Sequence, residues 1–154
     1  MAVRDPAYAI QAGVFAALTA SADMIAAFGG PPRVYDTVPV DPAGNVITGA
    51  FPYLVIGDDQ LLPGSAGSST EIREIYVKVE VWSRPKTADM GEVKLIGGAV
   101  IAALDRHIDL IGHGVITHEL QEAKYMRQPD RLTRLGIITI KYETAPIGLP
   151  RSPF

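Results

Sequence analysis

The residues best suited to metal chemistry lie close together in the second half of the chain. His113 and His118 are five positions apart, Glu119 follows the second of them, and His107 is the only other histidine. A zinc site needs three or four such donors converging on one point. A spacing of five puts two residues on the same face of neither a helix nor a strand. We therefore expect a loop histidine and a strand histidine, and no metal site.

Other patterns that could support catalysis are incomplete. Asp58 and Asp59 follow an apolar run, but no second carboxylate or histidine has a spacing that pairs with them for acid–base work. The run Gly64-Ser65-Ala66-Gly67 lacks the lysine and the following Ser or Thr of a phosphate-binding loop, and a Gly-x-Ser-x-Gly nucleophile elbow is absent. We expect a solvated loop and a flexible connector here, no enzymatic activity and no cofactor.

One group of basic residues remains after these exclusions. Arg127, Arg131 and Arg134 are close in sequence, with Lys124 and Lys141 nearby. If the two flanking segments form a hairpin, these side chains gather at its tip. Two interpretations stay open: a solvated turn, or a contact with an acidic partner surface or with DNA passing through a channel.

The composition indicates a single globular domain. The chain has 154 residues, of which 47% are hydrophobic and 20% are charged, with a formal net charge of -3 and no cysteine. This balance argues against non-specific nucleic-acid binding by the whole surface, and it excludes disulfides and thiolate chemistry. The N-terminal residues lack the basic and apolar regions of a signal peptide. We expect a freely soluble chain that makes no membrane contact.

Three segments of the chain carry helix signals. Asp5-Pro6 predicts an N-cap and a first helical residue, with apolar residues at helical spacing to about Ala20. Ser21 predicts the cap of a second short helix that ends at Gly29-Gly30. Thr87 predicts the cap of a longer helix over residues 88–107, in which Gly97-Gly98 indicates either close packing on a sheet or a kink.

Strand signals fill most of the remaining chain. Strict alternation over residues 75–82 predicts the central strand, with its valines facing the core. We also expect a brief strand at 34–35, one at 52–56, and a hairpin from 115–126 and 135–144. Residues 41–49 and 58–70 are predicted loops. The sum is one α+β domain over residues 1–145, with an extended C-terminal arm over 146–154.

The expected architecture is a mixed, mostly antiparallel sheet of about four to five strands. The N-terminal helix and the long crossover helix pack on one face of it. The opposite face of the central strand carries Tyr76, Lys78 and Trp82. Either a second layer covers these side chains, or they form a subunit interface, where Trp and Tyr are enriched.

Four short runs occur in a fixed order along the chain: Arg33-Val34-Tyr35-Asp36, Phe51-Pro52-Tyr53 through Gly57, Val81-Trp82-Ser83, and Asp130 with Thr133-Arg134. In this order they resemble the tail-completion (tail terminator) proteins of long-tailed phages and phage-derived particles such as gene transfer agents. The resemblance extends over nearly the whole chain and begins with the opening helix. Residues 41–50 depart from it, because the family often passes more directly between the first two runs.

The resemblance implies a structural virion protein without catalytic residues. Such proteins assemble in the bacterial host cytoplasm as a ring, typically hexameric, on the head-proximal end of the tail tube. The ring stops tube polymerisation and joins the tail to the head connector, and DNA passes through its lumen without sequence-specific binding. For subunit or partner contacts we select Tyr76, Lys78, Trp82, Arg127, Arg131 and Arg134, together with loop 58–70. The alternatives are another head–tail joining (connector or stopper) ring protein and a small ligand-binding α+β domain.

Overall fold

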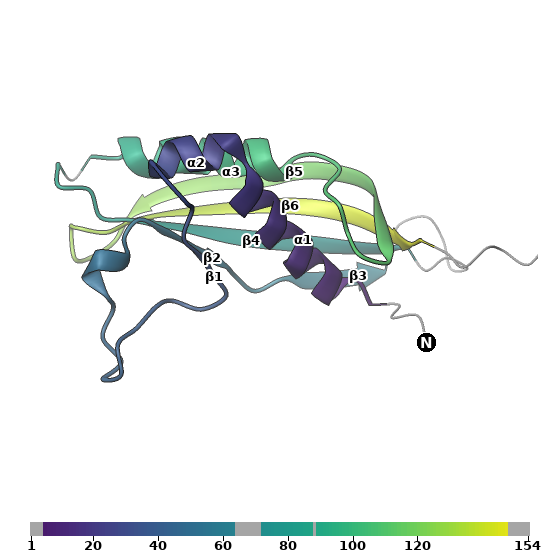
Figure 1. The fold of residues 1–154 in the computed structure, drawn as a ribbon, viewed down its shortest axis with the longest axis horizontal. Helices are drawn as coiled ribbons and strands as arrows, with labels where there is room; N and C mark the ends of the chain where they lie inside the picture. Colours follow the sequence, from purple (N-terminus) through teal and green to yellow (C-terminus); the bar gives the residue numbers. More distant parts are fainter. Residues whose placement is uncertain (1–4, 64–71, 88, 148–154) are drawn as a thin grey trace, which may run out of the picture.

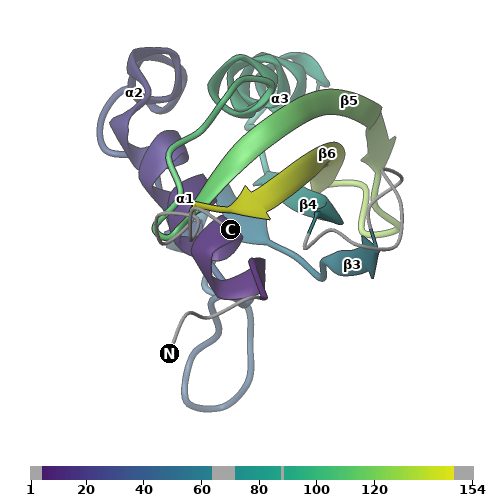
Figure 2. The ribbon, with the colours of Figure 1, turned by 90° about the vertical axis from the view of Figure 1, so that its right-hand side faces the viewer.

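The computed structural model describes residues 5–63, 72–87 and 89–147. In it, one face of a six-stranded, mostly antiparallel sheet is covered by three helices (Figures 1 and 2). The strand order is β1-β2-β4-β6-β5, with β3 also paired to β4. The helices are α1 (Ala7–Ala20), α2 (Ala22–Phe28) and α3 (Gly91–Leu104); the strands are β1 (Val34–Tyr35), β2 (Tyr53–Ile56), β3 (Gln60–Pro63), β4 (Arg73–Ser83), β5 (His113–Arg127) and β6 (Arg134–Pro146).

Helix α2 begins and ends at the predicted capping residues, whereas α1 begins one residue later than predicted. The Asp5 carboxylate accepts the backbone N–H of Ala7 at 2.8 Å, although Pro6 is the N-cap and not the first helical residue. Ser21 Oγ accepts the N–H of Met24 at 3.3 Å and opens α2. Gly29, with φ 69°, ends α2 in the left-handed conformation that glycine adopts without a steric cost.

The alternating residues of β4 build the core. Ile75, Val77, Val79 and Val81 are all at most 1% exposed. They face the helices together with their partners on β6, where Val79 pairs with Ile138. Tyr142 of β6 donates its hydroxyl to the carbonyl of Leu104, the last residue of α3, and so fixes the end of that helix to the sheet.

Helix α3 is shorter than the prediction of 88–107. It starts at Gly91, whose N–H donates to the Asp89 carboxylate at 2.8 Å, while the Thr87 hydroxyl donates to that same carboxylate instead of capping the helix. The Gly97-Gly98 pair is explained by packing at its first member. A Cβ on Gly97 would lie 2.2 Å from the Tyr125 hydroxyl oxygen, whereas one on Gly98 would meet nothing within 4 Å.

The prediction of an unbroken loop over 58–70 is wrong, because residues 60–63 form β3. This short strand pairs antiparallel with the first half of β4, Gln60 opposite Tyr76 and Pro63 opposite Arg73. A distant partner strand makes the extension possible, and no local signal encodes it. Residues 64–71 lie outside the described part of the chain, as do 148–154 of the predicted arm, while Pro146 closes β6.

The predicted hairpin is present and forms one long side of the sheet. β5 and β6 pair from Arg127 opposite Arg134 to His113 opposite Pro146. The register of β5 shifts twice, between Val115 and Thr117 and between Leu120 and Glu122. Such irregularities bend a strand and increase its twist, and β5 arches strongly in Figure 2.

Candidate assembly surfaces

Arg84 holds the hairpin tip by its side-chain contacts, although the sequence analysis did not select this residue. Its guanidinium lies 3.3 Å from the Asp130 carboxylate and donates to Thr133 Oγ1 at 3.0 Å. It also lies over the Phe51 ring, 4.5 Å from the centroid. Arg84 directly follows β4, and β4 pairs with β6, so the missing information was this strand pairing.

Asp130 is the acceptor at the centre of this turn. Hydrogen bonds from the Thr133 hydroxyl at 2.6 Å and from the backbone N–H groups of Thr133 and Leu132 stabilise its carboxylate, with a smaller effect from Arg84. They lower the pKa of Asp130 to about 2. The turn is therefore rigid while its carboxylate is ionised.

The three predicted arginines do not share one environment. Arg131 lies in the turn with φ 65° and is exposed, as is Arg127, the last residue of β5 before the turn. Arg134 is only 3% exposed, and its guanidinium donates to the backbone carbonyls of Arg131 and Thr133. The exposed positive charge at the tip therefore comes from Arg127 and Arg131.

The open face of β4 is divided into an aromatic end and a polar end. Trp82 stacks on Tyr53 with ring centroids 6.2 Å apart and an interplanar angle of 16°. Tyr35 and Phe51 complete this aromatic cluster. Trp82 is thus half-buried beside its cross-strand neighbour Tyr53, in a cluster formed with β2 and the segment before it. Lys78 is exposed and Tyr76 is half-buried.

An open polar groove of about 870 Å³ lies beside Lys78. Asp36, Asp58, Asp59 and Glu80 line it. Partial burial, followed by the nearby Asp58 charge, raises the pKa of Glu80. Asp58 and Asp59 are exposed, as predicted for a solvated loop.

The histidines come together differently from the prediction. His118 Nδ1 lies 2.8 Å from the Asp105 carboxylate, and the His107 ring meets His118 edge to face with centroids 4.9 Å apart. His113 is separate and 3% exposed. The neighbourhood of His107, His118 and Asp105 joins α3's end to β5, which spacing alone did not indicate. Within the described ranges, no group of three such donors has a geometry that could hold a metal ion.

No single helix of the described chain is long and apolar enough to cross a membrane. Only α1 and α2 together reach the required length and composition, and they are bent by 63° relative to each other.

The fold defines a class of protein: an α+β domain in which helices cover one face of a mostly antiparallel sheet. The sequence model of the family described as "Tail completion protein gp17" matches residues 12–144. The chain belongs to this tail completion protein family, whose members are structural, non-enzymatic proteins of phage-like particles.

The fold agrees with a solved structure of the same kind of particle. A chain of the "Virion of native gene transfer agent (GTA) particle" superposes with a TM-score of 0.73 at 22% identity, over 90% of this chain and 96% of that one. At this identity the likeness shows the fold. A search of curated proteins found no match.

Proposed function

We propose that this protein closes the head-proximal end of a phage-type tail tube as a ring, typically of six copies, and joins the tail to the head connector. The family match over residues 12–144 carries the proposal. Its partners are further copies of itself, the tail tube protein and the connector protein. Its location is the head-proximal end of the tail in the assembled particle.

The hairpin tip supports this role through its rigidity and charge. Arg127 and Arg131 project from a turn that Asp130 and Arg84 hold in place. Repeated around a ring, these pairs concentrate positive charge that a chain of net charge -3 does not otherwise have. They would face an acidic partner surface or the phosphates of DNA in the lumen, without reading its sequence.

The open face of β4 supports a second contact. Lys78 and the half-buried Tyr76 lie in an extended surface without a helical cover. Trp82 is half-buried in the aromatic cluster and stacks on Tyr53, so we give it a smaller part in this contact than Tyr76 and Lys78. We assign Tyr76 and Lys78 to the subunit or tube contact on this ground.

Purified tail tubes with growing ends test the proposal. The protein should bind one end of each tube, appear there as a ring in negative-stain images, and stop further addition of tube protein. Replacing Arg127 and Arg131 by Glu should weaken binding to the connector or the retention of DNA, while the double variant Lys86→Glu with Lys94→Glu, both exposed, makes the same change in net charge and is the control. Tubes that elongate unhindered at excess protein would refute the terminator role. Binding to the connector alone would favour a stopper protein.

A further inference from the structure

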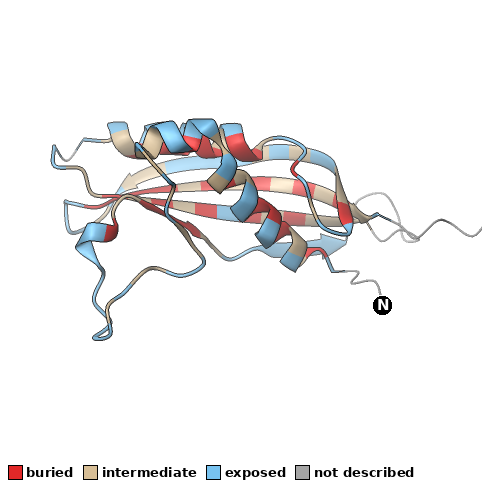
Figure 3. Ribbon diagram, in the orientation of Figure 1, coloured by how far each residue is buried: buried red, intermediate tan, exposed pale blue. Residues whose placement is uncertain are grey.

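One side of α1 is apolar although it lies on the outside of the molecule. The helix has no acidic or basic side chain from Ala7 to Ala20. Tyr8 is 81% and Phe15 47% exposed, and Ala12 between them is exposed as well. Figure 3 shows these pale-blue stretches along α1. Gln11 is the polar residue on this side, and the exposed aromatic side chains around it make the side suited to a partner.

A groove runs beside this side of the helix. It has a volume of about 430 Å³ and lies between α1 and β1. Phe15 and Ala12 line it from the helix, and Val34, Tyr35 and Ile56 line it from the sheet. Asp36 is its one charged side chain, and Gln11 is its one uncharged amide. The groove therefore suits a slender apolar segment better than a charged one.

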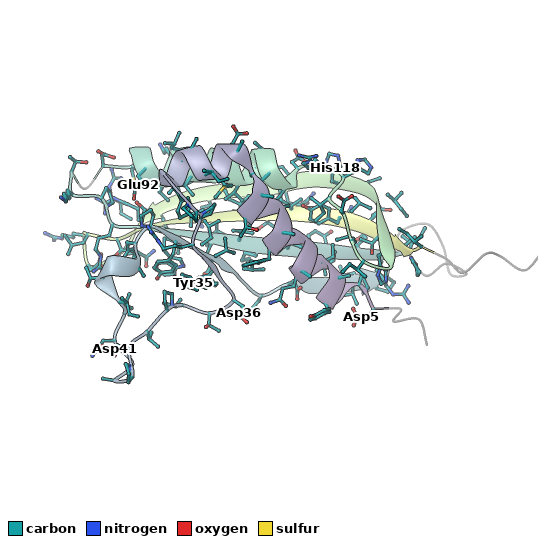
Figure 4. All side chains as sticks on the ribbon, in the orientation of Figure 1. Asp5, Tyr35, Asp36, Asp41, Glu92 and His118 are labelled. Carbon is teal, nitrogen blue, oxygen red and sulfur yellow. The ribbon has the colours of Figure 1, made fainter. Side chains whose placement is uncertain are left out.

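The same chain carries such a segment in residues 38–47, the projecting loop. It extends away from the sheet in both ribbon views, with Asp41 at its far end in Figure 4. Val40, Val46 and Ile47 are 50%, 44% and 43% exposed. Asp41 is the loop's only ionisable residue. Val38 packs against the aromatic cluster and Val46 lines a pocket beside it, whereas Val40 and Ile47 belong to neither hydrophobic cluster.

The projecting loop is nevertheless ordered by its own hydrogen bonds. The Asp41 carboxylate accepts the backbone N–H groups of Ala43 and Asn45, each at 2.9 Å. The N–H of Asp41 donates to the Asn45 carbonyl at 2.8 Å, and Val40 bridges Val46. A segment that is ordered before it binds loses little conformational entropy on binding. The loop is thus a preformed apolar projection.

We propose that the projecting loop of one copy docks in the α1 groove of the next copy. The inference rests on the proposed ring. A closed ring needs two different patches on each subunit, one to give and one to receive. The loop and the groove are two such patches, both apolar, and the loop's single carboxylate is already bonded within the loop. A second copy is the partner because each copy presents both surfaces.

Cross-linking tests this contact directly, because the chain has no cysteine. Val46→Cys and Phe15→Cys each introduce a single thiol. Chains of the two kinds, carrying tags of different size, are mixed with tail tubes and treated with a short bis-maleimide. We expect a linked dimer that contains one chain of each kind. As a matched control, Leu95→Cys on α3, where the side chain is 63% exposed, should give no dimer with Val46→Cys.

The outcomes separate the inference from the proposed function. Rings or capped tubes without the Val46–Phe15 link overturn the inference and leave the function intact. The link without binding to tube ends supports the inference and refutes the terminator role. Absence of rings, caps and links overturns both.

A second variant avoids reliance on the cross-link. Val46→Asp should leave the unfolding midpoint unchanged, because Val46 lies outside both hydrophobic clusters. It should weaken self-association about tenfold or more, as loss of a central apolar contact does. Mixed with Phe15→Asp, it should restore pairs but not rings, since one good contact remains per pair. Undiminished ring formation by Val46→Asp would overturn the inference.

Discussion

The two faces of β4 are made from one alternating strand but are completed in different ways. On the covered face, Ile75 and its neighbours contact helices and β6 and are fully buried. On the open face, Trp82 finds an aromatic partner at one end, while Lys78 lies beside an open polar groove at the other. Burial of apolar side chains on the covered face stabilises the fold, and the open face remains available for contacts. The variants that follow test this division.

The largest difference in the free energy of unfolding should appear between two positions on opposite faces of β4. Ile75→Ala should lower the free energy of unfolding by about 2–5 kcal/mol, because it leaves a cavity under the helices. Lys78→Ala should change it by less than about 0.5 kcal/mol. Urea titration followed by circular dichroism measures both. Equal losses at the two positions would show that the open face also carries the fold.

The fit of α3 to the covered face can be tested at Gly97. A Cβ there meets the ring of Tyr125, which also lies 3.1 Å from the position of a Cβ on Gly136. The ring is held between two glycines, so Gly97→Ala should lower the free energy of unfolding by about 1–3 kcal/mol, the usual cost of overpacking. A neutral result would mean that Tyr125 moves aside freely.

The next residue supplies the matched control. Gly98 points into open space, so Gly98→Ala should raise the free energy of unfolding by about 0.5–1 kcal/mol through helix propensity. The same urea titration applies. Destabilisation by this variant would indicate that the backbone at Gly98, and not only at Gly97, is fitted to a neighbour.

The smallest effect should come from the hairpin tip. Hydrogen bonds lower the pKa of Asp130 from 3.8 to about 2, so its ionised form is favoured in the folded chain. The associated stability is present above pH 4 and is lost as the pH falls toward 2. Because Asp130 is exposed, we expect less than about 1 kcal/mol. Urea midpoints at pH 5 and pH 2.5 should differ less in Asp130→Ala than in the original chain.

Local patterns predicted the elements whose residues determine their own environment. The alternation of β4, the cap at Ser21 and the glycine at the end of α2 are of this kind. The start of α3 was predicted three residues too early, because Thr87 bonds Asp89 instead of the helix. β3 was missed, because Gln60-Leu61-Leu62-Pro63 becomes a strand only beside a distant partner.

The surfaces were harder to predict than the fold for the same reason. The hairpin placed Arg127 and Arg131 together, but burial of Arg134 and the bridging role of Arg84 depend on the pairing of β4 with β6. The family was predicted from four runs in a fixed order, and the family model that matches residues 12–144 confirms this prediction. The interface assignments themselves stay predictions.

The two register shifts in β5 limit unwanted pairing of this edge strand with other chains. β5 is a fifteen-residue edge strand of the sheet, long enough to pair with strands of other chains. The shifts interrupt its ladder and bend it, so an incoming strand cannot match it along its full length. The sheet therefore carries, in this edge strand, a device against uncontrolled β-aggregation.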